Sequence, residues 1–325
     1  MIHKTTRSEG IDLARTLAIL GVVSVHSGCF SNGRFGVQLF FLVSGFLLAD
    51  LGNLSTREFL IRRGFRLFPL YWLILFLFYS NGQDSIGQFI PQILLIQSTY
   101  WNFNSMPGAW SISNEWLFSL ILPFINRLNK KYIFILIFIS WFGQFLGSYV
   151  VYVMGRVDIT NGINEYGLRI WLNTLNPGIN LAFLLIGVSL KKKFLPILRN
   201  KFVAFYIVVF AQLITHFTGL GLLFIWPLAH WAIFSLCITW TSNSNVIKSS
   251  INFIGQRTYG IFFIHFIILG YVQNTTIFSQ LSERFPFGNW IIFAITFACS
   301  LVLSEASWRL VERPSIIFSK RFINI

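Results

Sequence analysis

Ten stretches of this sequence are apolar over roughly the length that an α-helix needs to cross a lipid bilayer. A hydrocarbon core of ~30 Å requires about 20 consecutive, mostly apolar residues in helical form. The stretches lie at residues 11–31, 35–52, 67–81, 110–127, 132–153, 179–190, 202–218, 220–240, 258–274 and 288–308. The sequence therefore predicts an all-α polytopic membrane protein with about ten transmembrane helices.

The composition excludes a soluble enzyme of the ordinary kind. Hydrophobic residues make up 55% of the chain and charged residues only 11%, whereas soluble domains carry about 25% charged residues. The 37 phenylalanines exceed what a soluble core of this size can bury, but helices in lipid can expose them. The cysteines Cys29, Cys237 and Cys299 show no paired spacing, so we expect no metal or redox site.

The basic residues predict the orientation of the chain. With a cytoplasmic N-terminus, 20 of the 25 Lys and Arg residues lie in cytoplasmic segments, and four lie outside, namely Arg34, Arg156, Arg169 and Arg284. Cytoplasmic loops of membrane proteins collect positive charge. We therefore expect both termini in the cytoplasm and a first span that is retained rather than cleaved. The net charge of +14 then reflects topology rather than binding to nucleic acid.

The predicted spans are distributed over the whole chain, which indicates a single membrane domain. We expect residues 1–325 to form a single transmembrane domain, without a fused soluble hydrolase-like domain. Residues 86–98, IGQFIPQILLIQS, are too short and too polar for a confident span. They predict an interfacial or re-entrant helix.

The first span contains two ionisable residues, Arg15 and His26. They are eleven positions apart, so at about 100° per residue both side chains lie on one helix face, separated by ~16 Å along the axis. One interpretation is that Arg15 extends to the headgroups while His26 packs near the outer interface. The other is that both residues line a polar path, in which His26 takes and returns a proton.

Three arginines lie just before the third span, in the stretch FLIRRGFRLFPLYW. Arg62, Arg63 and Arg66 fall at the predicted cytoplasmic mouth, directly before Pro69. They can serve as positive anchors of the topology. Alternatively, guanidinium groups bind phosphates bidentately, so the cluster also suits a phosphorylated ligand.

The fourth span carries Glu115 near its predicted outer end, with Ser111 one helical turn earlier on the same face. A carboxylate inside a membrane is costly without a partner, and Arg15 or His26 are the candidates for that role. The alternative is an interfacial glutamate in contact with water.

The last two spans hold further polar residues. Tyr259 and His265 are six positions apart in the ninth span, so their side chains point to different faces. Glu305 lies almost inside the tenth span and needs a partner. In the sequence VERP at 311–314, Glu312, Arg313 and Pro314 mark the exit of this span, because proline is common just past a helix end.

Other residues of the spans predict structural roles. In the second span, Gly36, Ser44 and Gly45 would let a neighbouring backbone approach closely. His216 and His230 stand alone, and we interpret both as structural histidines.

Taken together, these residues resemble acyltransferase family 3, membrane proteins that include the O-acetyltransferases of bacterial surface polysaccharides. The matching pieces cover nearly the whole chain in order: the Arg15 and His26 pair, GVQLFFLVSGF at 36–46, RRGFRLFPLYW at 62–72, WSISNEW at 110–116, YGIFFIH at 259–265 and VERP at 311–314. Two positions depart from the family pattern, since Gln38 stands where many relatives have an acid and Asn114 where a small apolar residue is usual.

The resemblance implies an enzyme of the bacterial cytoplasmic (inner) membrane. It would transfer an acetyl or other short acyl group from cytoplasmic acyl-CoA to a hydroxyl of a surface glycan or its lipid-linked precursor. No cofactor would be bound permanently, because acyl-CoA is a donor substrate. The acceptor would be reached either directly or through a separate extracytoplasmic transferase.

The resemblance also implies roles for the residues above. His26 would act as general base or carry the acyl group itself, and Arg15 would stabilise the oxyanion or hold an acid in place. Glu115 would orient His26 or the acceptor. The remaining residues fall into two groups: Arg62, Arg63 and Arg66 would hold coenzyme A, whereas Ser111, Tyr259, His265 and Glu312 would bind substrate or support the structure.

A protein of another class is the main alternative. A non-enzymatic transporter or flippase of a lipid-linked saccharide would line its path with the same buried charges. Transporters commonly show two related halves, and this sequence shows no such repeat. A sensor or purely structural protein would leave the polar face of the first span unexplained. The sequence therefore favours the enzyme.

Overall fold

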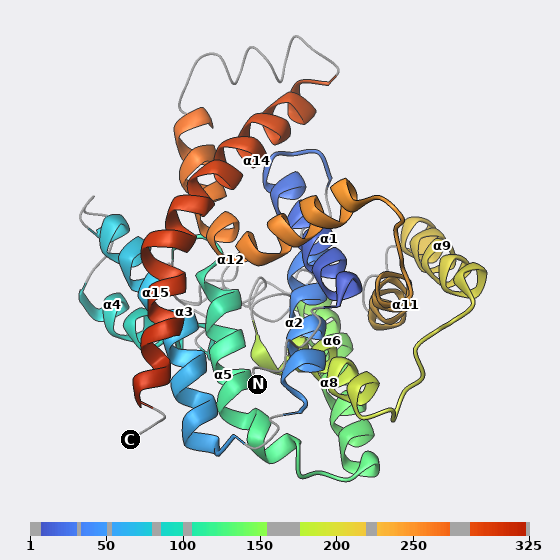
Figure 1. Cartoon of the computed structure of the whole chain (residues 1–325). Helices are drawn as coiled ribbons and strands as arrows, with labels where there is room; N and C mark the ends of the chain where they lie inside the picture. Colours follow the sequence, from blue (N-terminus) through green and yellow to red (C-terminus); the bar gives the residue numbers. More distant parts are fainter. Residues whose placement is uncertain are drawn as a thin grey trace. The chain divides into compact units, whose positions relative to one another are not determined.

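The computed structural model describes residues 8–30, 34–50, 54–79, 86–99, 106–154, 176–218, 226–273 and 287–322. Within these ranges all regular structure is helical (Figure 1). Each of the ten predicted stretches overlaps one helix: α1 (Glu9–His26), α2 (Arg34–Leu48), α3 (Thr56–Tyr79), α5 (Ala109–Ile125), α6 (Lys130–Met154), α8 (Pro177–Lys191), α9 (Lys201–Thr218), α11 (Trp226–Ile238), α12 (Asn245–Gln273) and α14 (Gly288–Ser307). The all-α prediction is confirmed for this part of the chain.

The chain divides into two compact units. Unit 1 comprises residues 1–43, 196–221 and 228–306, and it contains α1, most of α2, α9, α11, α12 and α14. Unit 2 comprises residues 44–195, 222–227 and 307–325, and it contains α3, α5, α6 and α8.

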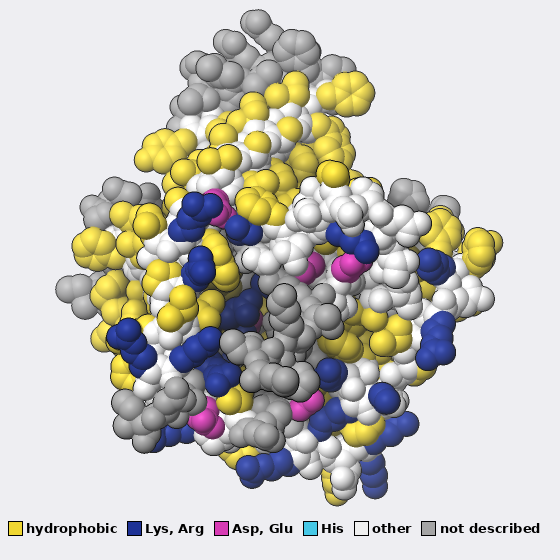
Figure 2. All heavy atoms as spheres, in the orientation of Figure 1, with side chains coloured by type: hydrophobic (Ala, Val, Ile, Leu, Met, Phe, Trp, Pro, Cys, Tyr) yellow, Lys and Arg dark blue, Asp and Glu magenta, His cyan; other side chains and the backbone are white. Residues whose placement is uncertain are grey.

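Two helical stretches among the described residues are both long and apolar enough to cross a membrane, Asn245–Val272 and Gly288–Phe322. The second buries only 22% of its most apolar window inside the protein. Hydrophobic side chains accordingly gather on the surface over α14 (Figure 2), where Val302 is 72% exposed. Such a surface suits contact with lipid. The number of crossings, ten, stays a prediction.

Two helices begin earlier than the sequence predicted. The third span was predicted from residue 67, but α3 begins at Thr56, and the ninth was predicted from residue 258, but α12 begins at Asn245. At the start of α3, the Glu58 carboxylate accepts the Ser55 N–H at 2.7 Å, and the Ser55 hydroxyl accepts the Glu58 N–H at 3.2 Å. This reciprocal capping box starts the helix well before the apolar stretch.

The helix does not stop at Glu312, Arg313 and Pro314, the predicted exit of the last span. After α14 the chain continues as a π-helical turn, η3 (Trp308–Glu312), then α15 (Arg313–Ser319) and a short 3-10 turn, η4 (Lys320–Phe322). Proline has no N–H for the regular helical bond, and an irregular π turn directly before Pro314 accommodates it without ending the helix. Within unit 2, Phe318 and Phe322 then pack on Phe65 of α3, with ring centroids 5.8 and 5.4 Å away.

Residues 86–98 form a short helix and a turn. The helix α4 covers Ile86–Ile93, and the 3-10 turn η1 covers Gln97–Thr99. The turn packs on α5, since the Ser98 and Ser113 hydroxyls lie 2.7 Å apart and Gln97 donates to the Ala109 carbonyl at 3.1 Å. The prediction that this segment does not span is confirmed by its length; its interfacial or re-entrant position stays a prediction.

The predicted close approach at the glycines of α2 is confirmed. A Cβ atom at Gly36 would overlap the carbonyl oxygen of Ala18 in α1. Likewise, a Cβ at Gly45 would overlap the carbonyl oxygen of Leu184 in α8. Only glycine lets these backbones meet, as small residues do in membrane helix packing.

Side-chain contacts fix the relative direction of two helix pairs. In unit 1, α1 and α12 run parallel, because their contacts advance together along both helices: Asp12 with Asn252, Arg15 with Thr258 and His26 with His265. In unit 2, α3 and α5 run antiparallel, with contacts between Arg63 and Ser119 and between Phe68 and Trp116.

Candidate active site

His26 is the last residue of α1, and the way this helix ends fixes its position. The Cys29 N–H donates to the Ser24 carbonyl at 2.8 Å, and the Gly28 N–H donates one turn back at 2.9 Å. Together they form a Schellman motif, in which Gly28 takes a φ of 78° that other residues disfavour. The Gly28 carbonyl also accepts the Asn289 amide at 3.0 Å, which ties the end of α1 to the start of α14.

The ring of His26 is exposed, but it also contacts α12. Its centroid lies 5.4 Å from that of His265 and 4.6 Å from that of Phe266. His265 is 0% exposed, and its Nδ1 lies 3.1 Å from the Ile261 carbonyl oxygen. The structure thus joins the predicted base to a second histidine, for which the sequence analysis predicted only a substrate-binding or structural role.

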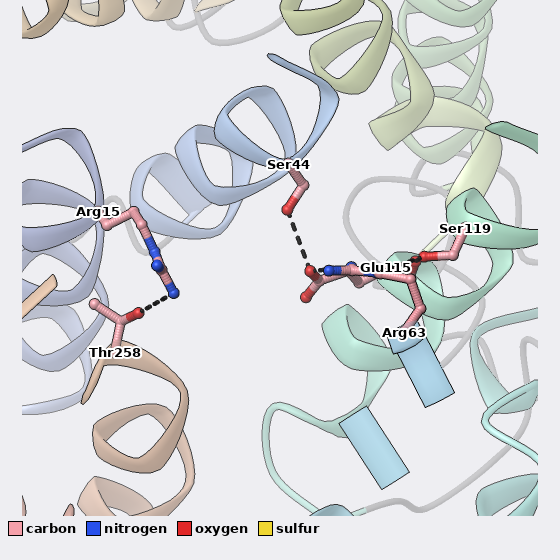
Figure 3. A network of polar contacts seen from close by, with 6 residues as sticks. All are labelled: Arg15, Ser44, Arg63, Glu115, Ser119 and Thr258. Carbon is pink, nitrogen blue, oxygen red and sulfur yellow. Dashed lines mark hydrogen bonds and ion pairs between the residues drawn. The ribbon is translucent and has the colours of Figure 1, made fainter. Parts of the chain in front are cut away.

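Arg15 lies half-buried between the same two helices, and its Nη2 donates to the Thr258 hydroxyl at 3.0 Å (Figure 3). His26 also contacts α12, so Arg15 and His26 share one face of α1, as their spacing predicted. Thr258 lies within the stretch RTYGIFFIH but was not singled out. The available signal was a hydroxyl directly before Tyr259, at the start of the apolar part of α12.

The sequence analysis also missed a buried acid. Asp12 is 1% exposed and accepts a hydrogen bond from the Asn252 amide at 3.0 Å. One turn nearer the helix start, Glu9 pairs with Lys248 at 3.0 Å on the surface. The available signal was an acid three positions before Arg15 on one face of α1. The contacts of Glu9, Asp12 and Arg15 with α12 form a polar seam between α1 and α12.

Glu115 forms a buried ion pair in unit 2 (Figure 3). Arg63 Nη2 lies 2.5 Å from Glu115 Oε1, with the two side chains only 7% and 20% exposed. The same oxygen accepts the Ser44 hydroxyl at 3.2 Å, and Arg63 Nε donates to the Ser119 hydroxyl at 3.2 Å. The ion pair and its two hydroxyl partners therefore link α3 and α5 to the end of α2 that belongs to unit 2.

This pair changes the interpretation of Arg63. The sequence analysis placed it with its neighbours at a cytoplasmic mouth and gave Glu115 other candidate partners. Because α3 begins at Thr56, Arg63 lies two turns inside a helix and faces α5, where its charge is compensated by Glu115. Its predicted contact with phosphates would have to compete with this bond.

The two other arginines of the cluster differ in exposure. Arg62 is exposed and Arg66 half-buried, and they lie one turn apart on α3. The charge of Arg66 also acts on Glu115. Outside the predicted span, hydrogen bonds from Ser55 hold the pKa of Glu58 below its usual value, and the charge of Arg62 adds to this effect.

Three further polar residues singled out in the sequence form contacts within the protein. Glu305 has the partner that its position required, because its carboxylate pairs with Arg257, which is itself buried within α12 rather than in a loop. The Glu312 carboxylate accepts the Ser307 hydroxyl at 3.1 Å. Ser111 donates to the carbonyl of Gly108 at 2.9 Å. None of these contacts shows a ligand role.

Tyr259 and the lone histidines complete the set. The Tyr259 ring packs on Phe263 at 5.3 Å and is 9% exposed. His230 is fully buried, and its Nε2 lies 3.1 Å from the Phe35 carbonyl oxygen. The side chain of His216 lies outside the described residues. Among the residues that the structure describes, no cluster of His, Cys, Asp and Glu could hold a metal ion.

Comparison with known families shows to which family the chain belongs. A family model described as "Acyltransferase domain" matches residues 8–308. The chain belongs to acyltransferase family 3. The match includes every residue of the seam between α1 and α12 and the pair on α3 and α5.

Curated relatives agree with the family. The chain is 23% identical over 350 residues to a Staphylococcus aureus (strain COL) protein named "Putative O-acetyltransferase", covering 94% of this chain and 56% of that protein. It is 25% identical over 372 residues to a Bacillus subtilis protein named "Putative peptidoglycan O-acetyltransferase", covering 97% and 56%. It is also 23% identical to the O-acetyltransferase OatA of Staphylococcus aureus, covering 94% and 56%.

The chain therefore spans 56% of the length of these relatives. No solved structure matches it.

Proposed function

We propose that this chain is a multi-pass membrane O-acyltransferase of the bacterial cytoplasmic membrane. It transfers an acetyl or other short acyl group from cytoplasmic acyl-CoA to a hydroxyl of a surface glycan or a lipid-linked precursor. The observation that carries the proposal is the exposed His26 at the end of α1, in one seam with Arg15, within a chain that matches an acyltransferase family. The relative named for peptidoglycan makes a cell-wall glycan the first acceptor to test.

Helix directions support the proposed topology of ten spans with both termini inside. Spans that alternate in direction require the first and ninth, α1 and α12, to be parallel and the third and fourth, α3 and α5, to be antiparallel. Both relations hold. Gly10 at the start of α1 also touches Cys237 at the end of α11, which the same topology places on the same side.

In the proposed reaction, His26 takes the proton of the acceptor hydroxyl as its oxygen attacks the thioester carbon. The C–S bond then breaks, and His26 returns the proton to the thiolate of coenzyme A. Transient transfer of the acyl group to the imidazole is the second route. Arg15 stabilises the developing oxyanion, or fixes the donor along the face of α1 that it shares with His26.

Donor binding is assigned chiefly to Arg62 and Arg66. One turn apart on α3, they can hold the phosphates of coenzyme A, while Arg63 is occupied by Glu115. We assign Glu115 to holding Arg63 in place rather than to His26. The bilayer and the glycan acceptor are the other partners, with a separate extracytoplasmic transferase as the relay where the acceptor is remote.

The competing proposal is a flippase or transporter of a lipid-linked saccharide. Family membership and the O-acetyltransferase relatives favour the enzyme. Mass analysis of surface glycans from cells with the wild-type chain, with His26→Ala and without the chain tests the choice. We expect an ester-sized mass only with the wild type. Unmodified glycan that fails to reach the surface without the chain would instead favour transport.

A further inference from the structure

His265 is a buried histidine for which the proposed reaction has so far given no role. It is 0% exposed and lies in the last third of α12. Its Nδ1 lies 3.1 Å from the Ile261 carbonyl oxygen, one turn back. A carbonyl can only accept, so Nδ1 carries the hydrogen and donates it. In the neutral ring, Nε2 then offers a lone pair.

That lone pair has no hydrogen-bond donor among the described residues, although the Nε2 atom is buried. Buried polar atoms are nearly always paired, and an exception in a structured helix needs a reason. His230, in the same unit, is equally buried and has its Nε2 3.1 Å from a backbone carbonyl oxygen, but neither of its ring nitrogens is left without a partner. His265 differs by leaving an acceptor open.

The nearest polar ring to His265 is His26. Their centroids are 5.4 Å apart and the rings are tilted by 42°. Two imidazoles joined by an N–H···N bond of about 3 Å would have centroids about 5 Å apart. Phe266 contacts both rings, at 4.6 and 4.0 Å, and restricts their motion. The separation of the two rings is therefore compatible with such a bond, although the bond is not formed in this structure.

Among the described residues of unit 1, the other rings that contact the two histidines are apolar. Phe262 and Phe266 are the other rings that pack on them. Among the described residues of this unit, no carboxylate forms a hydrogen bond or ion pair with either imidazole, unlike the acid that orients the histidine of a catalytic triad. Nε2 of His265 is thus a buried acceptor without a partner among the described residues, on a ring that contacts the His26 ring.

We propose that His265 is the positioning residue for His26, accepting a hydrogen bond from its N–H so that the opposite ring nitrogen faces the acceptor as a base. This inference rests on the proposed acyl transfer. When His26 takes the hydroxyl proton, its other N–H is held by His265, which spreads the positive charge over two rings. The proton then leaves with the thiolate of coenzyme A, and both histidines end neutral.

Two substitutions separate this role from packing. His265→Gln keeps a side-chain acceptor that can receive the His26 N–H, but its amide cannot take a proton. His265→Phe keeps the ring and the apolar contacts but has no acceptor. A positioning role predicts that Gln retains more activity than Phe, whereas a packing role predicts the reverse order.

The experiment uses membrane vesicles with matched amounts of each full-length variant and acetyl-CoA labelled in its acetyl group. Base-labile label in the glycan fraction is followed as a function of pH. We expect His265→Phe to lose about 100-fold in maximal rate and its acid-side midpoint to fall by about one pH unit. His265→Gln should lose less than Phe. His230→Gln, which removes an equally buried histidine, should leave the pH midpoint unchanged.

The outcomes separate this inference from the function beneath it. Label in wild type that is lost in His26→Ala, together with a His265→Phe variant of unchanged rate and pH midpoint, would overturn the positioning role alone. Equal or better activity of Phe than of Gln would do the same. Absence of label in the wild type would overturn acyl transfer and the pair with it.

Discussion

Arg63 and Glu115 bond across α3 and α5 with 2.5 Å between nitrogen and oxygen, and both side chains are largely buried. Each charge is tolerable there only because of the other. We predict that Arg63→Met or Glu115→Met alone destabilises the protein by about 3–5 kcal/mol, because the remaining charge is left buried and unpaired. The double variant should lose much less than the sum of the single losses.

Thermal unfolding of the purified protein in detergent measures this coupling. Glu58→Gln is a matched control, since it removes a glutamate that shares no bond with the pair, and it should change the melting temperature little. Losses that simply add in the double variant would show that the two residues act independently.

Arg62 and Arg66 should act on the donor rather than on stability. We predict that replacing both with Gln raises the apparent KM for acyl-CoA about tenfold or more, with little change in kcat, because phosphate contacts persist from ground state to transition state. Initial rates in membranes over a range of acyl-CoA concentrations measure the effect. Arg57→Gln, an exposed arginine of the same helix, is the control.

A different result would contradict the assignment of Arg62 and Arg66 to donor binding. An unchanged KM, with altered accessibility of the loops on either side of α3, would assign these arginines to topology alone.

Hydropathy predicted which segments are helical but misplaced where two of them begin. It ended spans at charged residues, yet α12 continues through Arg257, whose charge is compensated by Glu305. α3 continues through Arg63 for the same reason. A window of sequence counts such charges as polar, because the partner that neutralises them lies on another helix.

The same limit applies to the site. Spacing along one helix was enough to place Arg15 and His26 on a common face, since the helical repeat is fixed. The partners of these residues lie on α12, more than two hundred positions later, and no local pattern encodes that pairing. Glu115 was recognised as needing a partner, but only the packing of α3 on α5 identifies Arg63.

The end of α8 offers a test of local backbone strain. Phe194 N–H donates to the Ser189 carbonyl at 2.8 Å, and Lys193 takes a φ of 59° at the position where such motifs favour glycine. We predict that Lys193→Gly stabilises the protein by about 1 kcal/mol, because glycine adopts this conformation without steric cost. Thermal unfolding in detergent measures it.

A neighbouring lysine gives the contrast. Lys192 donates from Nζ to the Asn126 carbonyl at 2.5 Å, and partial burial lowers its pKa. Lys192→Gly loses that bond and should destabilise the protein. Equal effects of the two glycine variants would mean that the backbone angle is not the cause.

His26 is the residue on which the proposed chemistry depends most. His26→Ala should lower acyl transfer by about 10²–10⁴-fold, because it deletes the base and adds no charge to the membrane. Protein amount and membrane insertion should match the wild type. His216→Ala should have a milder effect, and full activity of His26→Ala would remove His26 from the mechanism.

Arg15 poses the sharpest choice between anchoring and chemistry. If its charge serves only the topology, lysine should replace it well, since both side chains reach the headgroups and both are positive. In the structure, however, Arg15 points from α1 toward α12 and donates to the Thr258 hydroxyl. A planar guanidinium can keep that bond and still present further N–H groups to a thioester oxygen, whereas an ammonium has a different geometry.

We therefore predict that Arg15→Lys loses about 100-fold in acyl transfer at normal membrane insertion, the scale seen when one oxyanion donor is removed. Thr258→Val deletes only the acceptor that orients the guanidinium, so its loss should be smaller and of the same kind. Both are measured as label transfer from acetyl-CoA in membranes with matched protein amounts. Near-normal turnover of Arg15→Lys would make Arg15 a topological anchor, and the oxyanion would then need another donor on the face of α1 that carries His26.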